Sequence, residues 1–77
     1  MTERIKRPRM DALATLRRWR GLTQRELSAA LGLSPATVAQ WERGYCLPST
    51  ENLQAIADLF GCSVDAVLGR EPLEKPG

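Results

Sequence analysis

The sequence predicts an all-α domain of five short helices, and three observations support this fold class. Apolar residues recur at helical spacing, and the clearest stripe consists of Leu53, Ile56, Ala57 and Phe60. A glycine follows each helical stretch, where a helix is expected to stop. No stretch alternates apolar and polar residues as a half-buried strand does. The predicted helices span residues 10–20, 24–31, 35–43, 50–60 and 64–68, ending at Gly21, Gly32, Gly44, Gly61 and Gly69.

Length and composition indicate one small globular domain. The chain has 77 residues, of which 43% are hydrophobic and 26% are charged, as in ordinary globular proteins. No apolar run approaches the roughly 20 residues of a membrane-spanning helix, and the N-terminus lacks a signal-like apolar stretch. We therefore expect a cytoplasmic protein without a membrane partner.

Positive charge is concentrated at the N-terminal end of the chain. The formal net charge is only +2, but residues 1–20 carry +5 and residues 21–77 carry −3. We predict a basic N-terminal arm at 1–9, a helical domain at 10–69 and a flexible C-terminal tail at 70–77. A basic end is expected to face phosphate, although a charged tail can also simply maintain solubility.

Catalysis and metal binding have little support. The chain contains no histidine, no Gly-rich phosphate loop and no serine in a nucleophile-elbow pattern. Cys46 and Cys62 fit no metal-binding spacing, and free thiols are the simplest interpretation, with a disulfide left open. We predict no enzymatic activity, no cofactor and no metal site.

The stretch TQRELSAALGLSPATVAQWERG, residues 23–44, predicts two helices joined by a tight turn. Thr23 and Glu26 have the spacing of a capping box, in which each side chain pairs with the other residue's backbone N–H. Gly32 is placed for a left-handed stop. Ser34 is predicted to cap the second helix, with Pro35 in its first turn. This pattern indicates a helix-turn-helix unit.

Residues 11–69 resemble the phage-repressor-like (Cro/repressor, or XRE) helix-turn-helix domain. The matching residues are Gly21-Leu22-Thr23-Gln24, Glu26-Leu27, Leu31-Gly32-Leu33-Ser34, Val38, Trp41-Glu42-Arg43-Gly44, Pro48-Ser49, Leu53, Ile56-Ala57, Leu59, Gly61 and Ser63-Val64-Asp65. The resemblance implies a five-helix lambda-repressor-like fold and double-stranded DNA as a partner, with helix 35–43 in the major groove.

The resemblance also implies which residues contact DNA. Those expected to face base edges are Ser34, Pro35, Ala36, Thr37 and Gln40, and Gln40 is suited to a bidentate contact with adenine. Phosphate contacts are expected from Gln24, Thr37, Arg43 and Arg25. For Gln40 and Arg25, the alternative is an ordinary solvated helix residue. Pro35 and Ala36 depart from the polar pair often found in the family, which puts direct base readout there in doubt.

Other parts of the chain carry further expectations. The arm residues Arg4, Lys6, Arg7 and Arg9 resemble basic arms that enter a minor groove or follow the DNA backbone, and disorder is the alternative. By resemblance, Arg17 and Glu42 pair across two helices, and Ser28 occupies a close helix crossing. Trp19 is expected to pack partly over the core, and the alternative is an exposed tryptophan that marks a partner surface. A homodimer is expected, and by resemblance to relatives its interface is placed at Cys62, Val64 and Leu68.

The leading interpretation is a sequence-specific DNA-binding transcriptional regulator acting as a repressor. Two alternatives stay open from the sequence. The chain could be an antitoxin that combines DNA binding with a protein partner, or a helix-turn-helix module used mainly for protein contacts. The predicted core consists of Leu13, Leu16, Leu22, Leu27, Ala30, Leu31, Leu33, Val38, Trp41, Leu53, Ile56, Ala57, Phe60, Val64 and Val67.

Overall fold

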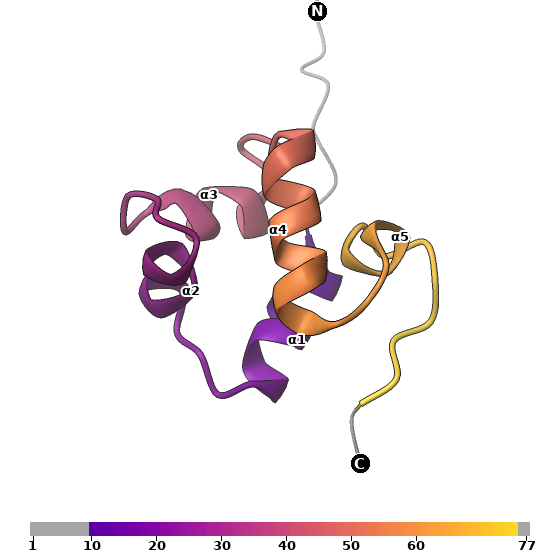
Figure 1. The fold of residues 1–77 in the computed structure, drawn as a ribbon. Helices are drawn as coiled ribbons and strands as arrows, with labels where there is room; N and C mark the ends of the chain where they lie inside the picture. The colour runs from indigo at the N-terminus through magenta and orange to yellow at the C-terminus, as the bar shows by residue number, and fades with distance from the viewer. Residues whose placement is uncertain (1–9, 76–77) are drawn as a thin grey trace, which may run out of the picture.

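A computed structural model describes residues 10–75, which form five α-helices without a strand in this range (Figure 1). The helices are α1 (Asp11–Trp19), α2 (Gln24–Ala30), α3 (Thr37–Arg43), α4 (Thr50–Phe60) and α5 (Val64–Val67). The predicted all-α, lambda-repressor-like fold is confirmed, and each helix boundary lies within two residues of its predicted position. The predicted basic arm lies outside the described residues.

The helices surround one core to which every element contributes. Figure 1 shows α4 in the middle of the view, with α2 and α3 on one side and α5 on the other. α2 packs on α3, α4 packs on α5, and α1 contacts both α3 and α5. The first helix therefore connects the α2–α3 unit with the C-terminal part of the domain.

The core is built mainly from the predicted apolar residues. Buried members from α1 to α5 are Leu13, Leu16, Leu27, Val38, Trp41, Ile56, Ala57, Phe60 and Val67. The predicted residues Leu22, Leu31, Leu33, Leu53 and Val64 are half-buried and pack against them. Met10, Ala14 and Ala66 are also buried, although the sequence did not single them out.

The prediction that Ala30 lies in the core is wrong, because this residue is exposed. At 100° per residue, the inward face of α2 is centred on Leu27, Ser28 and Leu31, and Ala30 lies about 100° away from that centre. An apolar residue three positions after Leu27 satisfies helical spacing. It nevertheless falls on the solvent side of this helix.

The predicted helix ends are confirmed where local chemistry controls them. All five glycines at the predicted stops have positive φ angles between 67° and 79°. Ser49 Oγ accepts a hydrogen bond from the Asn52 N–H at 3.2 Å, and Ser63 Oγ accepts one from the Ala66 N–H at 3.0 Å. Serine caps therefore begin α4 and α5, where the sequence predicts the two helices to start.

The start of the C-terminal tail contacts the domain. The Arg70 N–H donates to the Asp65 carbonyl at 2.9 Å, and the half-buried Leu73 packs against the core. Leu73, which lies within the predicted tail, therefore packs against the domain. The flexibility of the tail stays a prediction.

Candidate nucleic-acid interface

The start of α2 is fixed by the predicted capping box. Thr23 Oγ1 accepts a hydrogen bond from the Glu26 N–H at 3.0 Å, and the Thr23 N–H donates to Glu26 Oε1 at 2.8 Å. The hydrogen bonds from the Thr23 backbone and hydroxyl lower the pKa of the Glu26 carboxyl, because they stabilise its charged form. The chain thus enters α2 in one defined direction, next to Gln24 and Arg25.

The turn between α2 and α3 is closed by backbone hydrogen bonds around Gly32. The Gly32 N–H donates to the Ala29 carbonyl at 3.0 Å, and the Leu33 N–H donates to the Ser28 carbonyl at 2.9 Å. Gly32 has φ +72°, a left-handed backbone conformation that residues with a side chain rarely adopt. The second of these bonds spans five residues, as in a Schellman motif, so the chain reverses within a few residues.

The predicted cap of α3 by Ser34 is wrong. α3 begins at Thr37, and its N-cap residue is Ala36. The Ser34 hydroxyl is hydrogen-bonded to the Thr37 hydroxyl at 2.8 Å, and the Ser34 carbonyl accepts the Thr37 N–H at 3.1 Å. Ser34, Pro35 and Ala36 therefore form a turn that leads into α3. A side-chain cap by Ser34 would accept the Thr37 N–H, but the Ser34 carbonyl already accepts that hydrogen.

The two sides of α3 differ sharply. Val38, Trp41 and Glu42 are buried against the rest of the domain. The predicted base-reading residues Ser34, Pro35, Ala36 and Gln40 are exposed, Thr37 is half-buried, and the predicted phosphate contact Arg43 is exposed. The structure thus leaves this set accessible in and around a helix whose other side is fixed in the core.

The predicted contacts on α2 lie next to the start of α3. A shallow hollow of about 270 Å³ is lined by Arg25, Glu26, Ala29, Leu33 and Pro35. Arg25 is exposed and Gln24 is half-buried. One surface therefore combines the beginning of α2 with the turn before α3, as expected for a helix-turn-helix unit.

A buried polar network holds α1, α2 and α3 together, and it confirms the predicted pairing of Arg17 with Glu42. Arg17 Nε lies 2.8 Å from Glu42 Oε2, and Arg17 Nη2 lies 3.1 Å from Glu42 Oε1. Arg17 Nη1 donates to the Leu22 carbonyl at 2.8 Å, just before α2. Both charged side chains are about 90% buried. A bidentate pair of this kind fixes the direction of both planar groups.

Gln24 belongs to the same network. Its Nε2 atom donates to Glu42 Oε1 at 3.0 Å, so the side chain braces α2 against α3. An amide nitrogen has two hydrogens, and the second one stays available for another acceptor. The phosphate contact expected of Gln24 stays a prediction, and it is compatible with the bracing role.

Ser28 makes a hydrogen bond that the sequence did not predict. Its side chain is fully buried at the α2–α3 crossing, as expected for a small residue there. In addition, Ser28 Oγ accepts a hydrogen bond from the Val38 N–H at 3.2 Å. Sequence alone offered one indication of this contact, a hydroxyl at a place where alanine would satisfy the packing.

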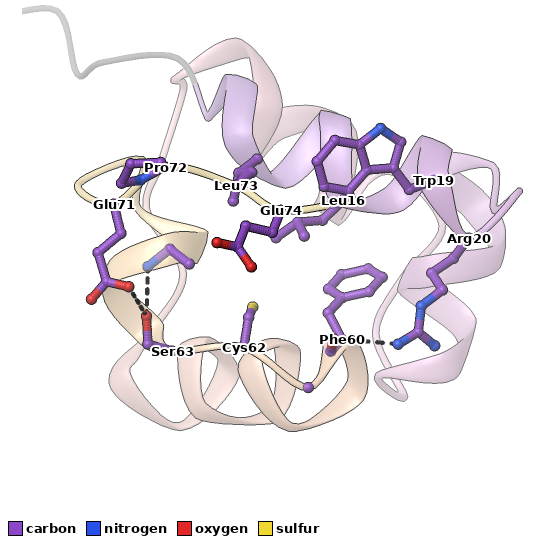
Figure 2. Close-up of a pocket in the computed structure, with 12 residues that line it drawn as sticks. Leu16, Trp19, Arg20, Phe60, Cys62, Ser63, Glu71, Pro72, Leu73 and Glu74 are labelled. Carbon is purple, nitrogen blue, oxygen red and sulfur yellow. Dashed lines mark hydrogen bonds between the residues drawn. The ribbon is translucent and has the colours of Figure 1, made fainter. Parts of the chain in front are cut away.

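The predicted dimer region lies on another part of the domain. Cys62 lines a groove of about 390 Å³ between the end of α1, the α4–α5 junction and the tail. Figure 2 shows the Cys62 thiol and the Glu74 carboxylate directed into this groove. Burial, with a smaller effect of the Glu71 charge, raises the pKa of the Cys62 thiol. Both cysteines are free, in agreement with the simpler prediction.

Val64 and Leu68, which are expected at the dimer interface, already take part in the packing of the domain itself. Both are half-buried and pack against the domain's own core, and Val67 is fully buried. The predicted interface therefore overlaps with intramolecular packing. Trp19 is half-buried against the core as predicted, beside Arg20, whose guanidinium lies 5.8 Å from the centre of the Phe60 ring.

Two further observations concern other kinds of site within the described residues. Between Met10 and Lys75, no three Cys, Asp or Glu side chains are grouped so that they could hold a metal ion. In the same range, none of the helices has the length and apolar character needed to cross a membrane.

Comparison with known proteins identifies relatives of this domain. A family described as helix-turn-helix matches residues 13–67. The HTH-type transcriptional regulator AnsR of Bacillus subtilis (strain 168) is 39% identical over 62 residues, which cover 80% of this chain and 53% of AnsR. The HTH-type transcriptional regulator DicA of Escherichia coli (strain K12) is 43% identical over 61 residues, covering 70% and 45%.

A phage protein is also similar. The immunity repressor protein of Bacillus phage phi105 is 36% identical over 63 residues, which cover 82% of this chain and 44% of that protein. The chain spans about half the length of these curated relatives. Their names describe regulators and a repressor, and none of them describes an enzyme.

The Arg17–Glu42 pair yields a test of the network. Arg17→Met should lower the free energy of unfolding by about 3 kcal/mol, because it leaves the Glu42 carboxylate buried without its cation. Combining it with Glu42→Leu should recover much of that loss. Urea denaturation of the parent, both single variants and the double variant measures the coupling. Arg18→Met, at an exposed arginine on the same helix, is the matched control, and strictly additive losses would contradict the interaction.

Proposed function

Because the chain belongs to the helix-turn-helix family of the Cro/repressor (XRE) type, we propose that it is a cytoplasmic, sequence-specific DNA-binding regulator of transcription that acts as a repressor. In this proposal, the protein occupies an operator and α3 lies in the major groove of that DNA. The named regulators and repressor among the relatives support the proposal. Repression would follow from blocking access to the occupied DNA.

The observation that carries the proposal is the two-sided character of α3. Its inner side is held by Val38, Trp41 and the Glu42 network, so the helix has one orientation in the domain. Its outer side is accessible and carries Gln40 and Arg43. A rigid helix with a free polar face has the geometry needed to read base edges.

The proposed contacts divide into two groups. Ser34, Pro35, Ala36, Thr37 and Gln40 face bases, and the apolar members are suited to a thymine methyl group. Gln24, Arg25, Thr37 and Arg43 contact phosphates and set the orientation of the domain on the duplex. The arm residues Arg4, Lys6, Arg7 and Arg9 are proposed to add contacts to the backbone or the minor groove.

A homodimer on a two-fold operator is part of the proposal. One domain of this size provides only about 600–1,000 Å² of contact with DNA. Two copies on half-sites about 34 Å apart would double the number of base contacts. We place the contact between copies at Cys62, Val64 and Leu68, beside the α4–α5 junction.

Selection of binding sites from random DNA tests the proposed function directly. A repressor of this kind should enrich a palindromic sequence. The logarithm of its binding constant for that sequence should fall linearly with the logarithm of the salt concentration. Binding without any preferred sequence, or no salt-dependent binding, would favour a module for protein contacts. A protein partner that binds the domain tightly would point to the antitoxin alternative.

Gln40 provides the sharpest test of base readout. Gln40→Ala should weaken binding to the selected operator by about 1–3 kcal/mol and relax the preference at one base pair in each half-site. Gel-shift titration against operators altered at single positions measures both effects. Gln54→Ala removes the same side chain from an exposed position on α4 and should change neither. If the Gln40 variant matches the parent on every operator, the assignment is wrong.

The basic arm is tested by deletion of residues 1–9. The deletion should weaken binding to all DNA sequences and flatten the salt dependence, by about 0.9 in slope for each phosphate contact removed. Replacing Arg4, Lys6, Arg7 and Arg9 with glutamine keeps the length of the arm and should have a similar effect. A truncated protein with the parent's salt slope would show that the arm contributes no charge contact.

The dimer contact is tested at Leu68. Leu68→Glu should abolish cooperative occupation of a two-half-site operator and leave binding to a single half-site intact, because a buried carboxylate opposes association. Sedimentation and gel-shift titration measure the two properties, and a thermal melt verifies that the variant is folded. Gln54→Glu adds the same charge on the exposed face of α4 as a control. A parent protein that fills both half-sites independently would contradict the dimer.

A further inference from the structure

The first turn of α3 has no side-chain cap of its own. Its N-cap residue is Ala36, whose methyl group accepts no hydrogen bond. The neighbouring Ser34 hydroxyl is already paired with the Thr37 hydroxyl at 2.8 Å. The first four N–H groups of any helix lack an acceptor within that helix, and α3 is only seven residues long. An uncapped start would therefore affect a large share of its backbone donors.

α2 supplies an acceptor for this turn. Ser28 Oγ lies 3.2 Å from the backbone nitrogen of Val38 and accepts its hydrogen. Both residues are fully buried, so water cannot replace the serine hydroxyl there. A buried N–H without an acceptor is costly, because it loses its hydrogen bond to water on folding and gains none. The cap of α3 thus comes from the preceding helix.

The same residue also closes the turn between the two helices. The carbonyl of Ser28 accepts the Leu33 N–H at 2.9 Å, while its hydroxyl accepts the Val38 N–H. One residue therefore fixes both the path of the turn and the first turn of α3. Alanine would satisfy the close packing at this crossing, so the hydroxyl adds the link between the helices.

We propose that Ser28 is a positioning residue for sequence readout, which sets α3 against α2 through the Val38 N–H. This inference rests on the proposed DNA-binding function. Bidentate contacts with base edges, proposed for Gln40, need closely defined geometry. Phosphate contacts by a long side chain such as Arg25 tolerate small displacements. Loss of the Ser28 hydroxyl should therefore reduce specific binding more than non-specific binding.

The test compares Ser28→Ala with Ile56→Val. Ile56 is fully buried on α4, and shortening it lowers stability while leaving the Ser28 hydroxyl and its hydrogen bond to Val38 in place. At a temperature at which both variants are fully folded, Ser28→Ala should bind the selected operator about three- to tenfold more weakly, the range expected from one lost hydrogen bond. Its affinity for non-specific DNA should match that of the parent. Ile56→Val should change neither affinity.

Amide hydrogen exchange in the free protein tests the hydrogen bond itself. Ser28→Ala should accelerate exchange at Val38 by about tenfold beyond any change at Trp41, whereas Ile56→Val should affect both amides through global stability alone. Unchanged relative exchange at Val38 would overturn the cap. Faster exchange with an unchanged ratio of specific to non-specific affinity would overturn the positioning role.

The two measurements also separate this inference from the proposed function. A parent protein without sequence preference would contradict the proposed function, and the role of Ser28 in readout would be overturned with it. The exchange rates would still decide whether α2 caps α3. A parent with clear sequence preference, together with a Ser28→Ala variant that keeps the full preference, would contradict the positioning role alone.

Discussion

The pairing of Arg17 with Glu42 is the interaction on which the arrangement of the first three helices depends. The guanidinium of Arg17 reaches the Glu42 carboxylate with two nitrogens and the Leu22 carbonyl with the third. Because both charges are largely buried, separating them would leave each charge unpaired in the interior, without the attraction that offsets its desolvation. The pair therefore restricts how α1, the start of α2 and α3 can be arranged, whatever its net contribution to stability.

The stability of α3 depends on its neighbours more than on its own sequence. Helices as short as α3 are unstable in isolation, because few hydrogen bonds offset the cost of forming the first turn. Here Ser28 binds the first turn and Glu42 links the last turn to α1 and α2. With both ends fixed, the outer face carrying Gln40 is presented with little freedom.

The part of the domain remote from α3 has a different character. Around the α4–α5 junction, Trp19, Phe60 and Leu73 line a groove that also contains the carboxylate of Glu74 (Figure 2). The acidic residues of α5 and the tail lie in this half of the sequence, whereas the cations concentrate towards the N-terminus. The groove itself carries both signs of charge, because Arg20 at the end of α1 lines it together with Glu71 and Glu74.

The sequence by itself determined the features that follow from local chemistry. The capping box at Thr23, the serine caps of α4 and α5 and the left-handed glycines each involve residues only a few positions apart. The Arg17–Glu42 pair was expected only through resemblance to a known family. Tertiary structure decided the rest. The Ser28–Val38 hydrogen bond, the start of α3 at Thr37, the exposure of Ala30 and the packing of Leu73 depend on which elements meet in space. Spacing along one helix does not contain that information, because burial is set by the neighbouring helices.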